Sequence, residues 1–256
     1  MNPAQPWLTV LMPAYNEEVA IEPSVRLVLA RLRALDIAAE LLIVDDCSTD
    51  QTGGIADRLS ADLAEVKVYH HPVNRGIGWG MLTGIAEACG EWLILIPADL
   101  ALDLAELPKY FTAARDADVV VGIRSDRRDY SAFRRVVSWA NIQLIRLLFG
   151  MEQRQYNYIS MYRVAVLRAV DIHYSHSAFF FAEILIKAKA LGARLVEVEI
   201  GYVPRSSGRA TGARLSLIAR TTRDMLLFRV RTLKTGTAPY GPRFDERSVV
   251  NRDGRR

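Results

Sequence analysis

Acidic side chains follow three short apolar runs in this sequence, each within a few residues of the end of the run. Glu17 follows the first run, the pair Asp45 and Asp46 follows the second, and Asp99 follows the third. An apolar run that ends abruptly in polar groups is typical of a buried parallel strand, and the carboxyl ends of such strands meet at one edge of an open sheet. Carboxylates at that edge can accept hydrogen bonds from a ligand or hold a hard cation. The sequence therefore predicts a ligand site there.

The elements that must position these groups follow from hydrophobic periodicity. Five short apolar runs have the length of buried strands, and the segments between them carry helical spacing, which predicts an α/β fold with a mostly parallel sheet flanked by helices. The second half of the chain instead predicts helices near 133–149, 179–191 and 213–233, an aromatic, polar stretch at 154–162 and a strand near 194–200. The five strand-like runs lie at 7–12, 40–45, 66–69, 92–96 and 118–122.

Composition bounds the class of the protein. A chain of 256 residues, 50% of them hydrophobic, can bury one sizeable core, so one large domain is the default. The net charge of +4 is a mild basic bias, and the basic residues lack the interleaved aromatic side chains of a nucleic-acid binder. Cys47 and Cys89 have no metal-binding spacing, which favours a reduced, cytoplasmic protein. No apolar run approaches the ~18–20 residues of a membrane span, so any membrane contact is expected to be peripheral.

Several motifs together carry a resemblance to a known family. The motifs at 13–18, 45–46 and 97–99 and an Arg-x-x-Gly loop at 205–208 resemble those of the inverting family 2 glycosyltransferases with the GT-A fold. Within that family they are most similar to the polyprenyl-phosphate sugar synthases, such as dolichyl-phosphate mannose synthase. The resemblance spans residues 7–212, which is most of the chain.

The resemblance also implies how the chain is divided. It predicts a glycosyltransferase domain at 1–235, with a nucleotide-binding half at 1–125 and an acceptor half at 126–235. The remaining basic tail at 236–256 is rich in Gly, Pro and charge, and we expect it to be disordered.

The same resemblance assigns residues to the site. In the family the first two motifs line the nucleotide pocket, the second Asp of the pair binds the base, and the Arg of the loop binds the pyrophosphate, a task for which a planar guanidinium is suited. Carried over, Asp99 and Arg205 are the expected catalytic residues, and Asp99 is also the expected metal ligand. The expected substrate-binding residues are Pro13, Ala14, Tyr15, Glu17, Val44, Asp46, Ala98, Arg124, Arg134 and Arg209.

Some residues depart from the family pattern. Pro97 stands where the family has the first Asp of Asp-x-Asp, and Ala101 stands where it has Gln, which leaves Asp99 as the one carboxylate of a divalent-cation site. A cation such as Mg²⁺ or Mn²⁺ can be held by one carboxylate when substrate phosphates and waters complete its shell. The sequence therefore gives a metal cofactor only weak support. Arg154 stands near an expected Asp, and Thr211 replaces an expected Lys.

These motifs also have ordinary structural interpretations. Asn16 could cap the helix after the first strand, the Asp45–Asp46 pair the next helix, and Asp99 the helix that follows it. The glycine-rich turn at 74–80 is expected to be mainly structural, because glycine permits a close approach of backbone to helix. Glu183, in an Ala-Glu pair like that of the family, is expected to orient its neighbours rather than to do chemistry.

The implied activity is hexosyl transfer with inversion. The expected donor is a nucleoside diphosphate sugar, either GDP-mannose or a UDP-sugar, and the expected acceptor is a polyprenyl phosphate at the cytoplasmic, inner face of the membrane. A phosphate acceptor is already anionic and needs no strong general base, so positioning and stabilisation of the leaving diphosphate would suffice. Two alternatives remain: a soluble glycosyltransferase with a non-lipid acceptor, and a nucleotide-sugar binding protein that has lost turnover.

The last expected helix bears on the membrane contact. Between residues 213 and 233 an apolar stripe that includes Ile218 and Met225 alternates with basic residues such as Arg220 and Arg223, which is the composition of an interfacial helix. The helix at 133–149 is apolar on most sides and would lie on the same surface. The alternative for the last helix is that its apolar stripe packs on the protein's own core.

Overall fold

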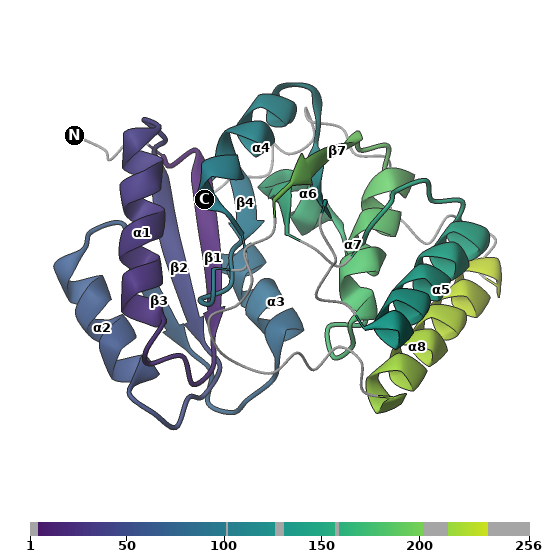
Figure 1. The fold of residues 1–256 in the computed structure, drawn as a ribbon, viewed down its shortest axis with the longest axis horizontal. Helices are drawn as coiled ribbons and strands as arrows, with labels where there is room; N and C mark the ends of the chain where they lie inside the picture. Colours follow the sequence, from purple (N-terminus) through teal and green to yellow (C-terminus); the bar gives the residue numbers. More distant parts are fainter. Residues whose placement is uncertain (1–4, 101, 126–130, 157–158, 202–214, 235–256) are drawn as a thin grey trace, which may run out of the picture.

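The computed structural model describes residues 5–100, 102–125, 131–156, 159–201 and 215–234. These residues form a seven-stranded sheet with strand order β3-β2-β1-β4-β6-β5-β7 (Figure 1). The expected basic tail, Ala101, Arg205 and Arg209 lie outside the described residues. The strands are β1 (Leu8–Ala14), β2 (Ala39–Asp45), β3 (Val66–His70), β4 (Trp92–Leu95), β5 (Val119–Arg124), β6 (Ser160–Arg163) and β7 (Leu195–Ile200).

The sheet is mostly parallel, as the sequence predicts. β1 pairs in parallel with β2 and β4, β2 pairs in parallel with β3, and β5 pairs in parallel with β7. β6 is the exception, because it runs antiparallel between β4 and β5. It lies at the end of the stretch 154–162, for which the sequence predicts no strand, and four residues are too few to show a strand period.

Helices cover both faces of the sheet. Along β1 and β2 the buried side chains alternate: Val10 and Ile43 belong to one core cluster, and Leu11 and Leu42 belong to the other. The first cluster also contains residues of α1, α2 and α4, and the second contains residues of α3 and α5 to α8. The helices are α1 (Ile21–Ala34), α2 (Thr52–Asp62), α3 (Ile77–Glu87), α4 (Leu107–Ala113), α5 (Ala132–Phe149), α6 (Val164–Ala169), α7 (Phe179–Ala190) and α8 (Leu215–Lys234), with the short 3₁₀ turns η1 (Leu104–Glu106) and η2 (Ala114–Asp116).

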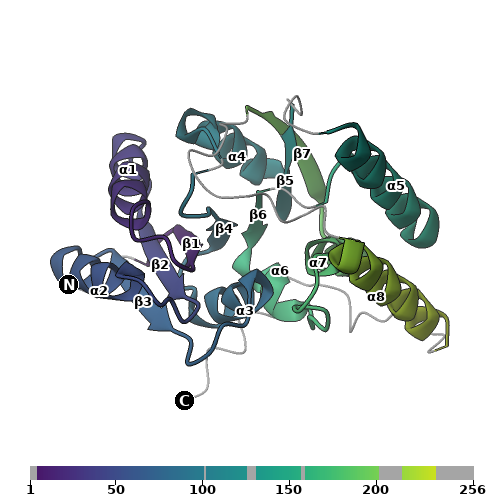
Figure 2. The ribbon, with the colours of Figure 1, turned by 60° about the horizontal axis from the view of Figure 1, so that its bottom comes forward.

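α5 and α8 lie side by side beyond the β7 end of the sheet (Figures 1 and 2). One face of α8 packs inward, with Met225 and Phe228 buried against Phe149 of α5 and Phe179 of α7. The alternative that this helix packs on the core is therefore correct for one of its faces. Within the part of the chain that the structure describes, no helix is both long enough and apolar enough to cross a membrane.

The structure removes two of the ordinary interpretations of the sequence motifs. α1 begins at Ile21 with Ala20 as its N-cap, so Asn16 does not cap it. The turn after Asp99 is capped by Asp103 instead, whose side chain accepts a 2.9 Å hydrogen bond from the N–H of Ala105. Asn16 and Asp99 are thus not explained by helix capping.

β5 passes so close to its neighbours that it needs a glycine. A Cβ at Gly122 would lie 2.2 Å from the carbonyl oxygen of Ile159 and 2.3 Å from the hydroxyl of Tyr110. We predict that Gly122→Ala lowers the free energy of unfolding by about 2–3 kcal/mol, because buried backbone must move to make room. Gly54→Ala is the matched control in α2, where the Cβ would meet only a side-chain oxygen at 3.9 Å. It should stabilise by about 0.5–1 kcal/mol in urea unfolding. Equal effects of the two changes would contradict this packing.

His70 at the end of β3 gives the stability a defined pH dependence. Its ring lies 2.9 Å from Asp45 and 3.0 Å from Asp57, and these hydrogen bonds, that of Asp45 first, raise the pKa of His70. A raised folded-state pKa means that the stabilisation is complete below the unfolded pKa of about 6.5 and is lost as the pH rises through the folded pKa. Native protein and His70→Gln should therefore differ more in unfolding free energy near pH 5.5 than near pH 8.5. A difference that does not change with pH would contradict the pairing.

Candidate active site

The carboxyl ends of β1 and β2 lie next to each other at one edge of the sheet. Ala14 is paired in register with Asp45, and the N–H of Asp46 donates a 2.9 Å hydrogen bond to the carbonyl of Ala14. Val44, the last apolar residue before the pair, is fully buried. The first two motifs that the sequence singles out are therefore brought together, as expected.

Asp46 is not a free side chain on this edge. Its side chain is only 9% exposed, and its Oδ1 accepts hydrogen bonds from Nδ1 of His71 at 2.8 Å and from the N–H of Arg75 at 2.9 Å. Its Oδ2 accepts a 2.6 Å hydrogen bond from the N–H of Gly76. The other ring nitrogen of His71 lies 2.9 Å from the hydroxyl of Thr83 in α3. Asp46 therefore organises the segment between β3 and α3.

Two loops at the edge are joined by reciprocal hydrogen bonds. The side-chain oxygen of Asn16 accepts from the N–H of Thr49 at 2.8 Å, while the N–H of Asn16 donates to the hydroxyl of Ser48 at 3.0 Å. The N–H of Glu17 donates to the hydroxyl of Thr52 at 2.8 Å. Asn16 has φ of 55°, a left-handed conformation that Asn tolerates better than most residues. These bonds hold the segment that carries Tyr15, whose side chain is 47% exposed at this edge of the sheet.

The glycine-rich turn brings α3 against both motifs and against a distant loop. Gly76 has φ of 83°, which favours glycine. A Cβ at Gly78 would lie 1.9 Å from the carbonyl oxygen of Ser175, and one at Gly80 would lie 3.5 Å from Cβ of Pro13. The structural interpretation of this turn agrees with these contacts, and the approach of Ser175 brings the loop before α7 to the start of α3.

The segment at 97–100 forms a tight turn after β4. The hydroxyl of Ser24 in α1 donates a 2.6 Å hydrogen bond to the carbonyl of Ala98, and the N–H of Leu100 donates a 3.0 Å bond to the carbonyl of Pro97. Ala98 is buried and Asp99 is half-buried. Among the described residues no three His, Cys, Asp or Glu side chains are grouped so that they could hold a metal ion. A cation at Asp99 would need oxygens from the substrate to complete its shell.

Arg124 ends β5 and is buried, and its carbonyl accepts a 2.9 Å hydrogen bond from the side chain of Gln155.

Arg154 has a structural function that the sequence did not suggest. Its guanidinium lies 2.8 Å from the carboxylate of Glu197 and 2.7 Å from that of Glu199. The residue that departs from the family pattern therefore joins the segment before β6 to β7.

Glu183 in α7 orients its neighbours, as expected. It is completely buried, and its carboxylate accepts hydrogen bonds from the N–H groups of His173 and Tyr174, both at 2.9 Å. The ammonium group of Lys187, also buried, donates a third bond at 2.7 Å. Because Glu183 and Lys187 are both buried, these hydrogen bonds hold the loop before α7 in place.

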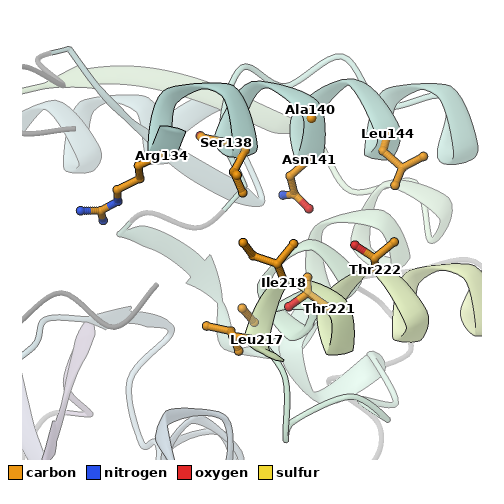
Figure 3. A pocket seen from close by; sticks show the side chains of 11 residues that line it. Arg134, Ser138, Ala140, Asn141, Leu144, Leu217, Ile218, Thr221 and Thr222 are labelled. Atoms are coloured by element: carbon orange, nitrogen blue, oxygen red, sulfur yellow. The ribbon is translucent and has the colours of Figure 1, made fainter. Parts of the chain in front are cut away.

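A pocket of about 450 Å³ lies between α5 and α8. Figure 3 shows Arg134 at one end of it, with Ser138 and Asn141 of α5 facing Ile218 and Thr221 of α8. Of this pocket the sequence predicts only Arg134. The other lining residues could have been found from small and polar residues that recur at helical spacing within two otherwise apolar helices, such as Ser138 and Asn141 in α5. The lining residues are Arg134, Val137, Ser138, Ala140, Asn141, Leu144, Ala178, Leu217, Ile218, Thr221 and Thr222.

Comparison with known proteins agrees with this geometry. The family model described as Glycosyl transferase family 2 matches residues 9–184. An undecaprenyl-phosphate mannosyltransferase of Micrococcus luteus is 31% identical over 210 residues, which is 78% of this chain and 85% of that protein. An undecaprenyl-phosphate 4-deoxy-4-formamido-L-arabinose transferase of Pectobacterium carotovorum is 27% identical over 215 residues, covering 82% of this chain but 64% of that protein.

Solved structures support the fold. Glucosyl-3-phosphoglycerate synthase of Mycobacterium tuberculosis, in complex with Mg²⁺ and uridine diphosphate, has a TM-score of 0.66 at 20% identity, covering 88% of this chain and 80% of that one. TarS of S. aureus, in complex with UDP-GlcNAc, has a TM-score of 0.60 at 21% identity, covering 86% of this chain and 65% of that one. With the family model matching more than half of its residues, the chain belongs to glycosyl transferase family 2 and is a glycosyltransferase with the GT-A fold.

Proposed function

We propose that this glycosyltransferase moves a sugar, with inversion, from a nucleoside diphosphate sugar to a polyprenyl phosphate at the cytoplasmic face of a membrane. The observation that carries the proposal is the pocket between α5 and α8, which combines apolar walls with the guanidinium of Arg134 at one end. A lipid phosphate has the same combination of an apolar chain and a charged head. Both relatives named above are, by their names, undecaprenyl-phosphate sugar transferases.

In this proposal the donor binds at the edge formed by β1, β2 and β4. Pro13, Ala14 and Val44 form the floor under the base, with Tyr15 at its side. Asp46 faces the base and Glu17 and Ala98 flank the nucleotide. The half-buried Asp99 lies on the turn after β4, where it would meet the diphosphate and the incoming acceptor.

The acceptor would occupy the pocket between the two helices. Arg134 and Ser138 lie one helical turn apart on α5 and would hold the phosphate, since a guanidinium and a hydroxyl can both donate to phosphate oxygens. The lipid would run past Leu144, Leu217 and Ile218. The pocket has the size and the largely apolar lining with a few placed polar groups that is usual for small-molecule sites.

The reaction asks little of the protein beyond positioning. An oxygen of the acceptor phosphate attacks the anomeric carbon from the side opposite the leaving group, and the bond from that carbon to the diphosphate oxygen breaks, so the configuration inverts. The electron pair and the negative charge pass to the leaving diphosphate. Arg124, with Arg205 and Arg209 outside the described residues, would stabilise that charge. No general base is needed because the acceptor phosphate is already anionic.

The metal would be an auxiliary rather than a fixed part of the site. Asp99 is the one protein ligand proposed, and a Mg²⁺ or Mn²⁺ ion would reach it bound to the donor diphosphate. Its chemistry would be to neutralise charge on the leaving group, a task that the arginines share.

The outer surface of the α5–α8 pair supports contact with a membrane. Large apolar side chains are exposed along it, and Trp139 is 63% exposed. Arg220 and Arg223 of α8 are exposed as well. Exposed apolar groups with flanking cations are typical of an interfacial helix. The other exposed large apolar residues of the pair are Phe133, Val136, Leu147, Leu226, Leu227, Val230 and Leu233.

The transfer itself is tested with labelled GDP- and UDP-sugars and a polyprenyl phosphate. We predict that label passes into the organic phase after solvent extraction, and that Arg134→Ala reduces this transfer at least tenfold while the protein stays folded. In the presence of EDTA, transfer should fall but persist. Label that stays in the aqueous phase as a new glycoside would favour a soluble acceptor, and no turnover at all would favour a binding protein.

Membrane contact is tested by co-sedimentation with anionic vesicles. Binding should weaken with salt and should fall when Arg220 and Arg223 are both changed to Glu, since each basic group near an anionic surface contributes about 1 kcal/mol. The control carries the same charge change at Arg58 in α2 and Arg115 in η2, both exposed on other elements. If the native protein remains in the supernatant at low salt, or if both double variants lose binding equally, α8 is not the membrane contact.

A further inference from the structure

The carboxylate of Asp46 has a limited capacity for further hydrogen bonds. An ionised carboxylate has about four acceptor positions, two on each oxygen, and donates none. Nδ1 of His71 and the N–H of Arg75 take both positions on Oδ1, at 2.8 and 2.9 Å. The N–H of Gly76 takes one position on Oδ2 at 2.6 Å. Among donors in the described residues, none takes the remaining position on Oδ2, so one acceptor position is left for a ligand.

The three bonds that are already made are well supported. His71 is held from its other side by the hydroxyl of Thr83, and its side chain is 10% exposed. The N–H groups of Arg75 and Gly76 belong to the turn that begins α3, whose close contact at Gly78 fixes its place. With the Asp46 side chain only 9% exposed, a ligand can approach its carboxylate over a small area. A base would meet the carboxylate as found, without displacing these donors.

Nucleobases differ in the number of donors that they bring to such a carboxylate. Uracil offers a single donor, N3–H, between two carbonyl acceptors. Guanine offers two adjacent donors, N1–H and N2–H, which pair with both oxygens of a carboxylate when both are free. At Asp46 one of the two guanine donors would be left without an acceptor, and an unpaired buried donor is costly. Cytosine can offer its N4 amino group to the open position, but its N3 is an acceptor and would face the carboxylate with like partial charge, which disfavours cytosine relative to uracil.

The neighbour of Asp46 complements the rest of the uracil edge. Arg75, whose N–H already bonds Oδ1, carries its guanidinium 4.2 Å from the ring centre of Trp79 in the first turn of α3. Guanidinium N–H groups are donors only, and the two carbonyl oxygens that flank N3–H in uracil are acceptors. The residue that donates its backbone N–H to Asp46 therefore also carries a cation with N–H donors on the same turn.

We infer that the donor of this enzyme is a uridine diphosphate sugar, selected by the single open acceptor position of Asp46. This inference rests on the proposed function and narrows it at the base-binding end of the site. It assigns discrimination against guanine to the hydrogen bonds that Asp46 makes to His71, Arg75 and Gly76, rather than to steric exclusion.

The test is a calorimetric titration of the full chain with UDP, GDP, CDP and 3-methyl-UDP at one fixed Mg²⁺ concentration. UDP should bind at least tenfold more tightly than GDP and CDP. 3-Methyl-UDP, which differs from UDP only in having a methyl group in place of the N3 hydrogen, should also bind at least tenfold more weakly. Binding of GDP equal to or tighter than that of UDP, or no effect of the methyl group, would overturn the inference.

A pair of variants separates base recognition from loop support. Asp46→Asn should weaken UDP at least tenfold but leave CDP as tight or tighter, because an amide can donate to N3 of cytosine where the carboxylate could not. The matched control is Asp45→Asn, which removes the same charge one residue away, where the side chain contacts Ser48 and His70. It should leave the ratio of UDP to CDP affinity unchanged. Equal loss of UDP and CDP in Asp46→Asn would mean that Asp46 only supports the loop, and would overturn the inference.

Failure of the inference can be told apart from failure of the proposed function. Tight GDP binding together with transfer from a GDP-sugar to polyprenyl phosphate would overturn the uridine assignment and leave the lipid-phosphate transferase standing. Binding of none of the four nucleotides would remove the donor site itself, and the inference with it. Selective UDP binding without transfer to lipid would support the inference and contradict the proposed acceptor.

Discussion

A buried carboxylate must be met by donors, because removing an ion from water costs several kcal/mol that only close partners can offset. Asp46 meets this requirement with the ring of His71 and two backbone N–H groups, all from the segment between β3 and α3. The charge at the end of β2 therefore helps to hold the turn that leads into α3. Since α3 packs its first turn over Pro13, the same charge also shapes the edge at which β1 and β2 end. Local order at the expected base pocket depends on this one group.

Glu183 satisfies the same requirement in the second half of the chain. It accepts from two N–H groups of the loop before α7 and from the buried Lys187, so that loop also has little freedom. The two arrangements meet at Gly78, where the loop approaches the start of α3 too closely for a side chain. In the proposed reaction, which brings two anionic substrates into line, such support from outside the substrate contacts would fix the relative placement of donor and acceptor.

The sequence predicts those parts of the structure that depend on local pattern. The buried parallel strands show as apolar runs. Asp45, Asp46 and Asp99 follow these runs, and they lie near one edge because the carboxyl ends of the strands meet there. β6 was not predicted, since its four residues gain their order from pairing with β4 and β5. The hydrogen bonds of the Asp46 carboxylate were not predicted for a related reason. Its partners lie 25 to 30 residues away along the chain, and hydrophobic periodicity carries no information about them. Arg154 departs from the family pattern in the sequence, but in the structure it forms ion pairs with Glu197 and Glu199 of β7. The sequence alone does not show that these three residues lie together.

The α5 and α8 helices differ both from core helices and from ordinary surface helices, because they expose large apolar side chains on one side and line a pocket on the other. Scattered exposed apolar side chains are normal, but here they gather on two adjacent helices, and the surfaces that face each other add a few polar groups to the apolar walls of a pocket. Aromatic contacts of Phe149 and Phe228 with Phe179 anchor the pair to α7. A polyprenyl chain does not leave a bilayer readily, so an enzyme of the proposed function without a spanning helix in its described part must bring its pocket to the lipid. A pair of helices that exposes apolar side chains outside, encloses a largely apolar pocket with a few polar groups, and is fixed to the core at one face meets that requirement.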